Sequence, residues 1–232
     1  MSSTSTAEKL EANTYEDVNH RGHFANANQP PPPPPAIARP ALPNGAALGL
    51  FSFGATCIGI SLYTANASGV TVPNAIVGLA LFTGGVAQYT GGVVEFVRGV
   101  TFTGSVFCIY STFWLSYAAV LLPNTGVAAA YADDPKMLGN ALGIYFVIWS
   151  IITVMFLLTA LRKTLALVIL LSLLSLTFLF FGITQFTHGN SRQATGVIGT
   201  ITGFGAFYVG LGELLGADPN PPFLLPQGVF KH

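Results

Sequence analysis

Charged residues are scarce in this sequence. Only 8% of its 232 residues are Asp, Glu, Lys or Arg, and 51% are apolar, whereas soluble domains carry about 25% charged residues. The formal net charge is zero and there is no basic patch, so nucleic acid is not an expected partner. Most of the protein surface must therefore face something other than water.

Catalytic, nucleotide and metal-binding motifs are absent as well. All four histidines lie in terminal segments or a polar loop, and there is no Walker sequence or His/Cys metal spacing. Cys57 and Cys108 lie inside apolar runs, where a free thiol acts as a small buried hydrophobe. We expect no enzyme, no cofactor and no metal site.

Six apolar stretches occupy residues 44–217. A bilayer core about 30 Å thick is crossed by about 20 helical residues, and a backbone in lipid must satisfy its own hydrogen bonds, which selects helices. We therefore predict an all-α polytopic membrane protein, a bundle of six transmembrane helices. The predicted helices span about Ala46–Thr64, Asn74–Val94, Thr101–Leu122, Leu138–Leu161, Thr164–Phe186 and Ala194–Leu215.

The two ends of the chain are polar. Residues 1–43 combine Ser, Thr, Asn and Glu with the proline run Pro30–Pro35, a composition that cannot offset its ordering entropy by burial. We predict a disordered N-terminal tail over residues 1–43, with its proline run extended, and a short C-terminal tail over residues 218–232. Six spans place both tails on one side of the membrane.

Positive charge is unevenly divided between the two sides. Arg39, Arg98 and the pair Arg162–Lys163 would lie on the side of the tails, and Lys136 and Arg192 on the other. The positive-inside rule then predicts cytoplasmic termini.

Small residues recur along one side of the second and sixth predicted helices. In the second helix this side consists of Asn74, Gly78, Leu81, Gly85, Gln88, Gly92 and Glu95. In the sixth it consists of Gly196, Gly199, Gly203, Ala206, Gly210 and Glu213. Close helix contact explains small residues, but it does not require Gln88 or the terminal glutamates. Helix contact and the lining of a narrow solute path therefore both stay open.

Two carboxylates end these helices. Glu95 is followed by Arg98 three residues later, which favours a local ion pair. Glu213 has no cation within reach along its own helix, and an ionisable residue in such a position is a functional-site hypothesis. Proton coupling or gating is therefore a candidate role for both, against a structural role.

Several short segments in the membrane region resemble the acetate uptake transporter family, the succinate–acetate permease group. They are Leu48–Phe53, Gly84–Gln88, Gly91–Glu95, Tyr110–Trp114, Leu138–Gly143 and Gly212–Leu215. The spacing of the third loop resembles the fungal acetate/ammonia transporter branch. The resemblance implies a six-helix carrier or channel of the plasma membrane for acetate and similar monocarboxylates, assembled as a homohexamer.

The family has a narrow waist of phenylalanine, tyrosine and leucine. The resemblance places the first two at Phe53 and Tyr110, and the leucine in the fifth helix at Leu174, with Leu173 or Leu176 as alternatives. A hydrophobic constriction of this kind gates by dewetting. Tyr110, about midway along its helix, also needs a partner for its hydroxyl.

One motif departs from the family. The family has the sequence Asn-Pro-Ala-Pro-Leu-Gly-Leu where this chain has Asn44–Leu50, and both prolines are missing here. Their loss loosens the turn at the mouth of the path. Asn44 and Gln88 remain as polar groups for contact with a solute.

We predict membrane transport of acetate or another small monocarboxylate, by a channel or a proton-coupled mechanism. The altered motif favours, as an alternative, an acetate-responsive sensor or regulator with little transport. A scaffold and an ammonium exporter are further alternatives.

Overall fold

The computed structural model describes residues 43–70, 72–187 and 191–229. All but the last residue of the predicted N-terminal tail lie outside the described residues, so its disorder stays a prediction. The six membrane helices are confirmed, and their ends differ from the predicted ones by a few residues. Among the described residues there is no sheet, only an isolated bridge between Thr164 and Val229.

Each of the six helices is long and apolar enough to cross a membrane. The second is a continuous rod, Pro73–Val97, built from the 3₁₀ turn Pro73–Ala75, α3, a π-helical stretch and α4. The bounds are α2 Ala46–Thr64, α3 Ile76–Gly78, the π-helical stretch Leu79–Ala87, α4 Gln88–Val97, α5 Thr101–Leu121, α6 Pro135–Ala160, α7 Leu165–Phe186 and α8 Arg192–Gly216.

Polar residues between the apolar runs fix where α6 and α7 begin. The Asp134 carboxylate accepts hydrogen bonds from the backbone N–H groups of Lys136 and Met137, each at 3.1 Å. The Thr164 hydroxyl accepts one from the N–H of Leu167 at 3.3 Å. Both caps satisfy donors that have no partner inside the helix.

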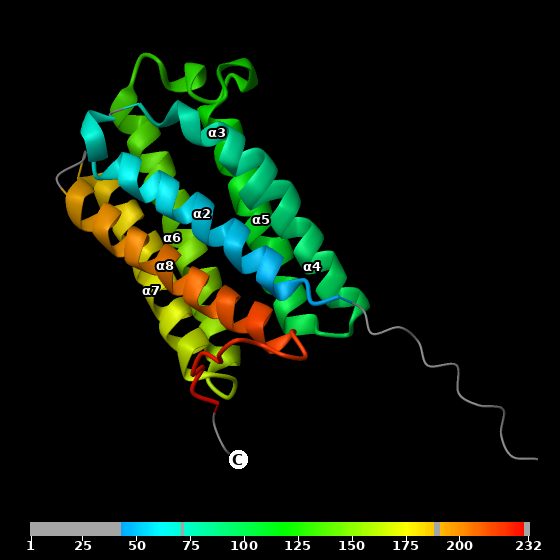
Figure 1. Cartoon of the computed structure of the whole chain (residues 1–232). Coiled ribbons are helices and arrows are strands. Elements are labelled where there is room, and N and C mark those ends of the chain that lie inside the picture. Colours follow the sequence, from blue (N-terminus) through cyan, green and yellow to red (C-terminus); the bar gives the residue numbers. More distant parts are fainter. Residues whose placement is uncertain (1–42, 71, 188–190, 230–232) are drawn as a thin grey trace, which may run out of the picture. The chain divides into compact units, whose positions relative to one another are not determined.

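Helix α2 packs against α8 on one side and against the second membrane helix on the other (Figure 1). The backbones approach closely: a Cβ added at Gly196 would lie 2.6 Å from the carbonyl oxygen of Ser61, and one at Gly91 would lie 2.8 Å from that of Gly45. Gly91 and Gly196 therefore allow close helix contact.

The π-helical stretch Leu79–Ala87 interrupts the predicted side of the second helix. Its wider turns change the phase of the following residues. Gly78, expected on the small-residue side, has no neighbour within 4 Å of an added Cβ, and Asn74 is exposed. Only Gly85, Gln88, Gly92 and Glu95 of that side are buried. The regular stripe expected from the sequence therefore applies only to the second half of the helix.

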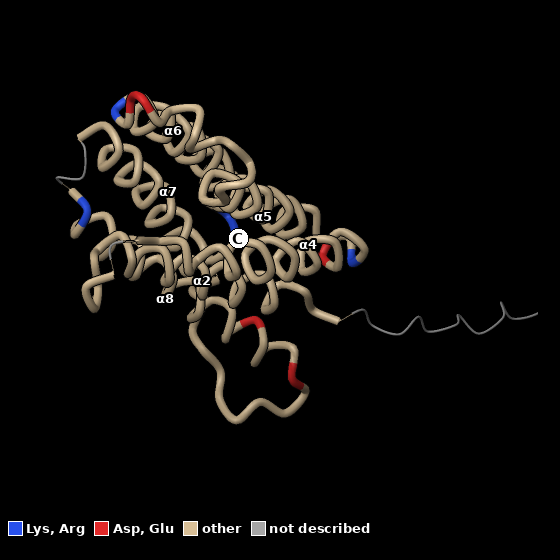
Figure 2. The backbone as a smooth tube through the Cα atoms, turned by 90° about the horizontal axis from the view of Figure 1, so that it is seen from above, with Lys and Arg blue, Asp and Glu red and all other residues tan. Residues whose placement is uncertain are grey.

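Charged residues lie at the two ends of the bundle, and the middle parts of the helices contain none (Figure 2). We call the end where α2 begins and α8 ends the proximal end; it carries Arg98 and the pair Arg162–Lys163. The opposite, distal end carries Lys136 and Arg192. Between the ends, apolar side chains face outward, as hydrocarbon requires: Phe82, for example, is 70% exposed.

Candidate functional site

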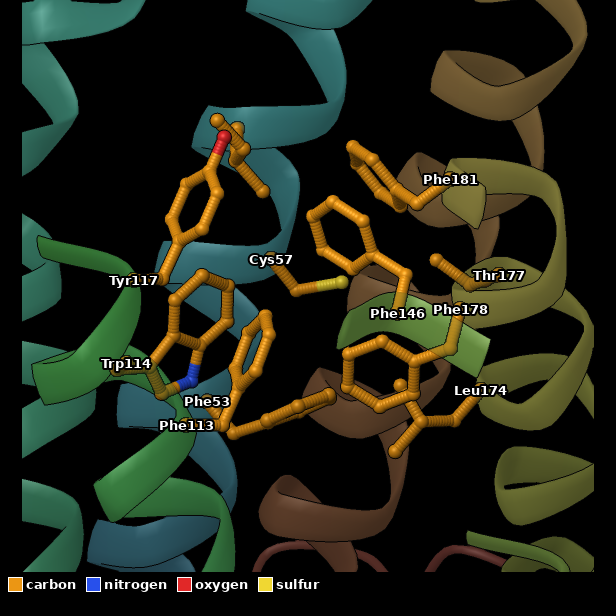
Figure 3. Close-up of a pocket in the computed structure, with 11 residues that line it drawn as sticks. Phe53, Cys57, Phe113, Trp114, Tyr117, Phe146, Leu174, Thr177, Phe178 and Phe181 are labelled. Carbon is orange, nitrogen blue, oxygen red and sulfur yellow. The ribbon is translucent and has the colours of Figure 1, made fainter. Parts of the chain in front are cut away.

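A small cavity lies in the middle of the bundle, among α2, α5, α6 and α7 (Figure 3). Its volume is about 20 Å³, room for about one water molecule. Aromatic rings form most of the wall, and no charged side chain lines it. The lining residues are Phe53, Cys57, Ile60, Phe113, Trp114, Tyr117, Phe146, Leu174, Thr177, Phe178 and Phe181.

The three predicted waist residues lie together at the proximal edge of this central cavity. Phe53 and Leu174 line it, and the ring of Tyr110 lies against Phe53 with centroids 5.9 Å apart. On its own helix each is nearer the proximal end than the other residues of the wall, since α2, α5 and α7 all begin there. The structure thus brings all three into one layer.

The three leucines considered for the third waist position have different surroundings. Leu174 lines the central cavity, Leu173 lines a groove between α7 and α8, and Leu176 is 46% exposed. The geometry favours Leu174, and its role in gating stays a prediction.

The hydroxyl of Tyr110 has a partner inside the bundle. It donates to Thr153 Oγ1 at 2.9 Å, and Thr153 in turn donates to the carbonyl oxygen of Trp149 at 2.7 Å. The Tyr110 ring also stacks on Phe178 with centroids 6.2 Å apart. These contacts fix the Tyr110 ring beside the cavity, packed against Phe53, and keep its hydroxyl paired.

Four aromatic residues of the wall, Phe113, Phe146, Phe178 and Phe181, are not foreseen by the sequence. Trp114 and Tyr117 follow Tyr110 at helical spacing, but Phe146 of α6 and Phe178 of α7 lie in helices that are apolar on all sides. Such helices carry no periodic signal that distinguishes their buried face.

Asn44, Glu95, Arg98 and Glu213 form one hydrogen-bonded network at the proximal end. Glu95 pairs with Arg98 and accepts the N–H of Gly45 at 2.8 Å. Asn44 accepts from Arg98 at 3.2 Å and donates to Glu213 at 3.1 Å. Glu95 is only 1% exposed, so Arg98 and the N–H of Gly45, the residue before α2, are the partners of its buried carboxylate.

A wider cavity of about 340 Å³ opens beside this network. Glu95, Arg98, Lys163 and Glu213 line it, and the ammonium of Lys163 lies 4.4 Å from the ring centroid of Phe102. This proximal vestibule therefore contains two carboxylates and two cations.

Gln88, the other predicted polar group of the path, lines none of these cavities. Its side chain is fully buried, and neither its Nε2 nor its Oε1 has a hydrogen-bond partner among the described residues. Buried amides in native proteins nearly always have a partner. The structure therefore places Gln88 inside the bundle but does not join it to the waist.

Comparison with known proteins finds relatives that are named as transport proteins. The chain is 37% identical to Ammonia transport outward protein 2 of Saccharomyces cerevisiae, over 71% of this chain and 59% of that protein. It is 31% identical to Acetate permease A of Emericella nidulans, over 89% of this chain and 72% of that protein. The chain thus spans about 59% of the length of two Saccharomyces cerevisiae relatives that it matches.

A solved structure has the same fold. The bacterial acetate channel SatP superimposes with a TM-score of 0.71 and 30% sequence identity, over 81% of this chain and 99% of that one. The family model described as GPR1/FUN34/yaaH matches residues 24–230. Since that match covers most of the sequence, the chain belongs to the GPR1/FUN34/yaaH family.

Proposed function

We propose that the protein passes acetate, or a carboxylate of similar size, across a membrane through the interior of its bundle. The observation that carries this proposal is the uncharged, water-sized central cavity, which lies between the proximal vestibule of about 340 Å³ and a distal throat of about 100 Å³. The names of Acetate permease A and of the acetate channel SatP support acetate as the solute.

The geometry suggests how the path is closed. An apolar constriction as narrow as that beside Phe53, Tyr110 and Leu174 excludes water and hydrated ions by dewetting, so a solute passes only when these side chains move. A fixed cation in a low dielectric would bind an anion too tightly to release it. Among the described residues, no cation lines the central cavity. Both a channel and a proton-coupled carrier agree with this arrangement.

We assign a proton-coupling or gating role to Glu213 rather than to Glu95. Glu213 is exposed at the proximal vestibule and is held by the neutral amide of Asn44. Glu95 is fixed by Arg98 and the N–H of Gly45, contacts that support a structural role.

We also propose a setting for the protein. The cations Arg98, Arg162 and Lys163 at the proximal end outnumber Lys136 and Arg192 at the distal end, which supports cytoplasmic termini. The family resemblance supports a homohexamer in the plasma membrane, with one path in each chain and no catalytic step.

Uptake of radiolabelled acetate into proteoliposomes, with and without a pH gradient, tests the function. Phe53→Ala widens the constriction, so we expect a several-fold change in acetate flux and permeation by larger carboxylates such as benzoate. Phe51→Ala is the matched control, because Phe51 lies on the same helix but packs on Phe207, with centroids 5.7 Å apart, outside the central cavity.

Two results would count against these assignments separately. Wild-type uptake no faster than in protein-free vesicles would remove the transport function. Equal size selectivity of Phe53→Ala and Phe51→Ala, in vesicles that do take up acetate, would remove only the waist.

Release of ammonia is a second candidate. The name of the yeast relative favours it, and an uncharged constriction would also pass a small neutral amine. A pH-sensitive dye inside the same vesicles distinguishes the two, since ammonia that enters makes the lumen alkaline. Protein-dependent alkalinisation without labelled acetate uptake would favour ammonia.

A further inference from the structure

At the distal end, two cavities lead from the surface to the central cavity. The outer one, the distal vestibule, has a volume of about 440 Å³, and the distal throat below it about 100 Å³. Thr184, Gln185 and Arg192 line both. The throat in turn shares Ile60, Tyr117 and Phe181 with the central cavity. The three spaces therefore follow one another toward the waist.

The distal route carries charge of one sign. Lys136 and Arg192 line the vestibule and Arg192 also lines the throat, and among the described residues no Asp or Glu lines either space. The nearby Asp134 is turned to the first turn of α6, where it accepts two backbone N–H groups. The proximal vestibule is different, because its cations share the space with Glu95 and Glu213.

A cleft lined by one sign of charge between apolar walls concentrates ions of the opposite sign. Arg192 stands where the wide vestibule narrows into the throat, the point at which a solute starts to lose water. A cation at this point draws a carboxylate into contact mainly by its charge, whether the cation is an arginine or a lysine. Arg192 is itself exposed, so such a contact would be screened by water and easily reversed.

The surrounding groups suit a carboxylate too. The hydroxyl of Thr184 is within hydrogen-bond distance of Ser191 Oγ at 2.9 Å and of Thr195 Oγ1 at 2.6 Å, which fixes its position beside Arg192 in the wall. The amide of Gln185 adds further donors. By contrast, the lining beyond the throat offers no charged group.

We propose that Arg192 is the capture site for small monocarboxylate anions at the distal mouth, and that it recruits them from solution before they enter the throat. This inference rests on the proposed transport of acetate and adds to it the residue that selects for negative charge. Lys136 contributes to the field of the vestibule but does not reach the throat.

The test uses initial rates of labelled acetate uptake by the full chain in liposomes, at subsaturating acetate and at low and high ionic strength. Arg192→Gln removes the charge and keeps polar donors, and Arg192→Lys keeps the charge. Arg162→Gln is the matched control, because it removes an exposed cation at the proximal end that lines none of these cavities.

At low ionic strength we expect Arg192→Gln to lower the rate about 5-fold or more, within the range known for electrostatic steering. Arg192→Lys and Arg162→Gln should stay within about 2-fold of wild type. At about 1 M salt the screening length is about 3 Å, so the difference between wild type and Arg192→Gln should nearly vanish.

Two outcomes overturn the capture role while transport itself stands. One is an Arg192→Gln rate equal to wild type at low ionic strength. The other is a loss of rate that is the same at both ionic strengths, or that Arg192→Lys fails to rescue, which would mark a structural role. Wild-type protein without any acetate flux would instead overturn the proposed function, and this inference with it.

Discussion

At the scale of single residues, Gln88 stands out because its buried amide lacks the hydrogen-bond partners that such a group requires. The side chain is fully buried in the second membrane helix, directly after the π-helical stretch Leu79–Ala87, and neither polar atom has a partner among the described residues. Burying an amide without a partner costs about 1–3 kcal/mol. Such a residue either reduces stability or contacts water or solute that enters the bundle.

Replacing Gln88 with Met separates these possibilities. Gln88→Met keeps the length of the side chain and removes both polar groups, so an unpaired amide predicts a free energy of unfolding higher by about 1 kcal/mol. Thermal unfolding in detergent measures it. Thr177→Val is the control and should lower the melting temperature, because it breaks the 2.8 Å hydroxyl contact with Thr202. A lower melting temperature for Gln88→Met would reveal a hidden partner.

At the scale of helices, the spans are predictable from sequence because an apolar run of about 20 residues has one solution in lipid. Which face of a helix is buried cannot be predicted where the helix is apolar on all sides, as α6 and α7 are. The place of Phe146 and Phe178 in the cavity wall is therefore not predictable. Nor does composition distinguish the π-helical stretch from ordinary helix. The positions of Phe53 and Tyr110 follow from the family resemblance, not from periodicity.

The contact between α2 and α8 gives a prediction at this scale. A Cβ at Gly196 would meet the backbone of α2 at 2.6 Å, whereas one at Gly205 has no neighbour closer than 3.5 Å. We expect Gly196→Ala to lower the melting temperature by several degrees, because backbone atoms cannot move aside. Gly205→Ala should be neutral or stabilising by up to about 1 kcal/mol. Equal melting temperatures for the two variants would contradict this account.

At the scale of the whole molecule, the two ends of the proposed path differ in charge. The hydrogen-bonded network at the proximal end joins Asn44 to Glu213, which are 169 residues apart in the sequence, so no local pattern reveals it. Its charges are paired or balanced, whereas the distal side presents only cations among its described lining residues. An anion would therefore meet an attractive field at one mouth and a nearly neutral one at the other.

At the proximal end, residues 226–228 also contact the helix bundle. The N–H groups of Leu165 and Ala166, which have no partner inside α7, donate to carbonyl oxygens of residues 227–228 at 2.8 and 3.1 Å. From α8, the hydroxyl of Tyr208 donates to the carbonyl oxygen of Pro226 at 2.6 Å. The segment 226–228 therefore ties the start of α7 to α8, two helices that also line the proximal vestibule.

Tyr208→Phe should weaken the attachment of residues 226–228, because it removes the hydroxyl and keeps the shape of the ring. The loss of one hydrogen bond costs about 0.5–1.5 kcal/mol, which would increase the opening of the segment and the hydrogen exchange of the Leu165 and Ala166 amides about 2- to 10-fold. Tyr89→Phe is the control, since the Tyr89 side chain is 49% exposed and lies on α4, outside the contacts of residues 226–228. Unchanged exchange at both amides in Tyr208→Phe would show that the backbone contacts hold the segment unaided, and the hydroxyl would then have no part in fixing the proximal mouth.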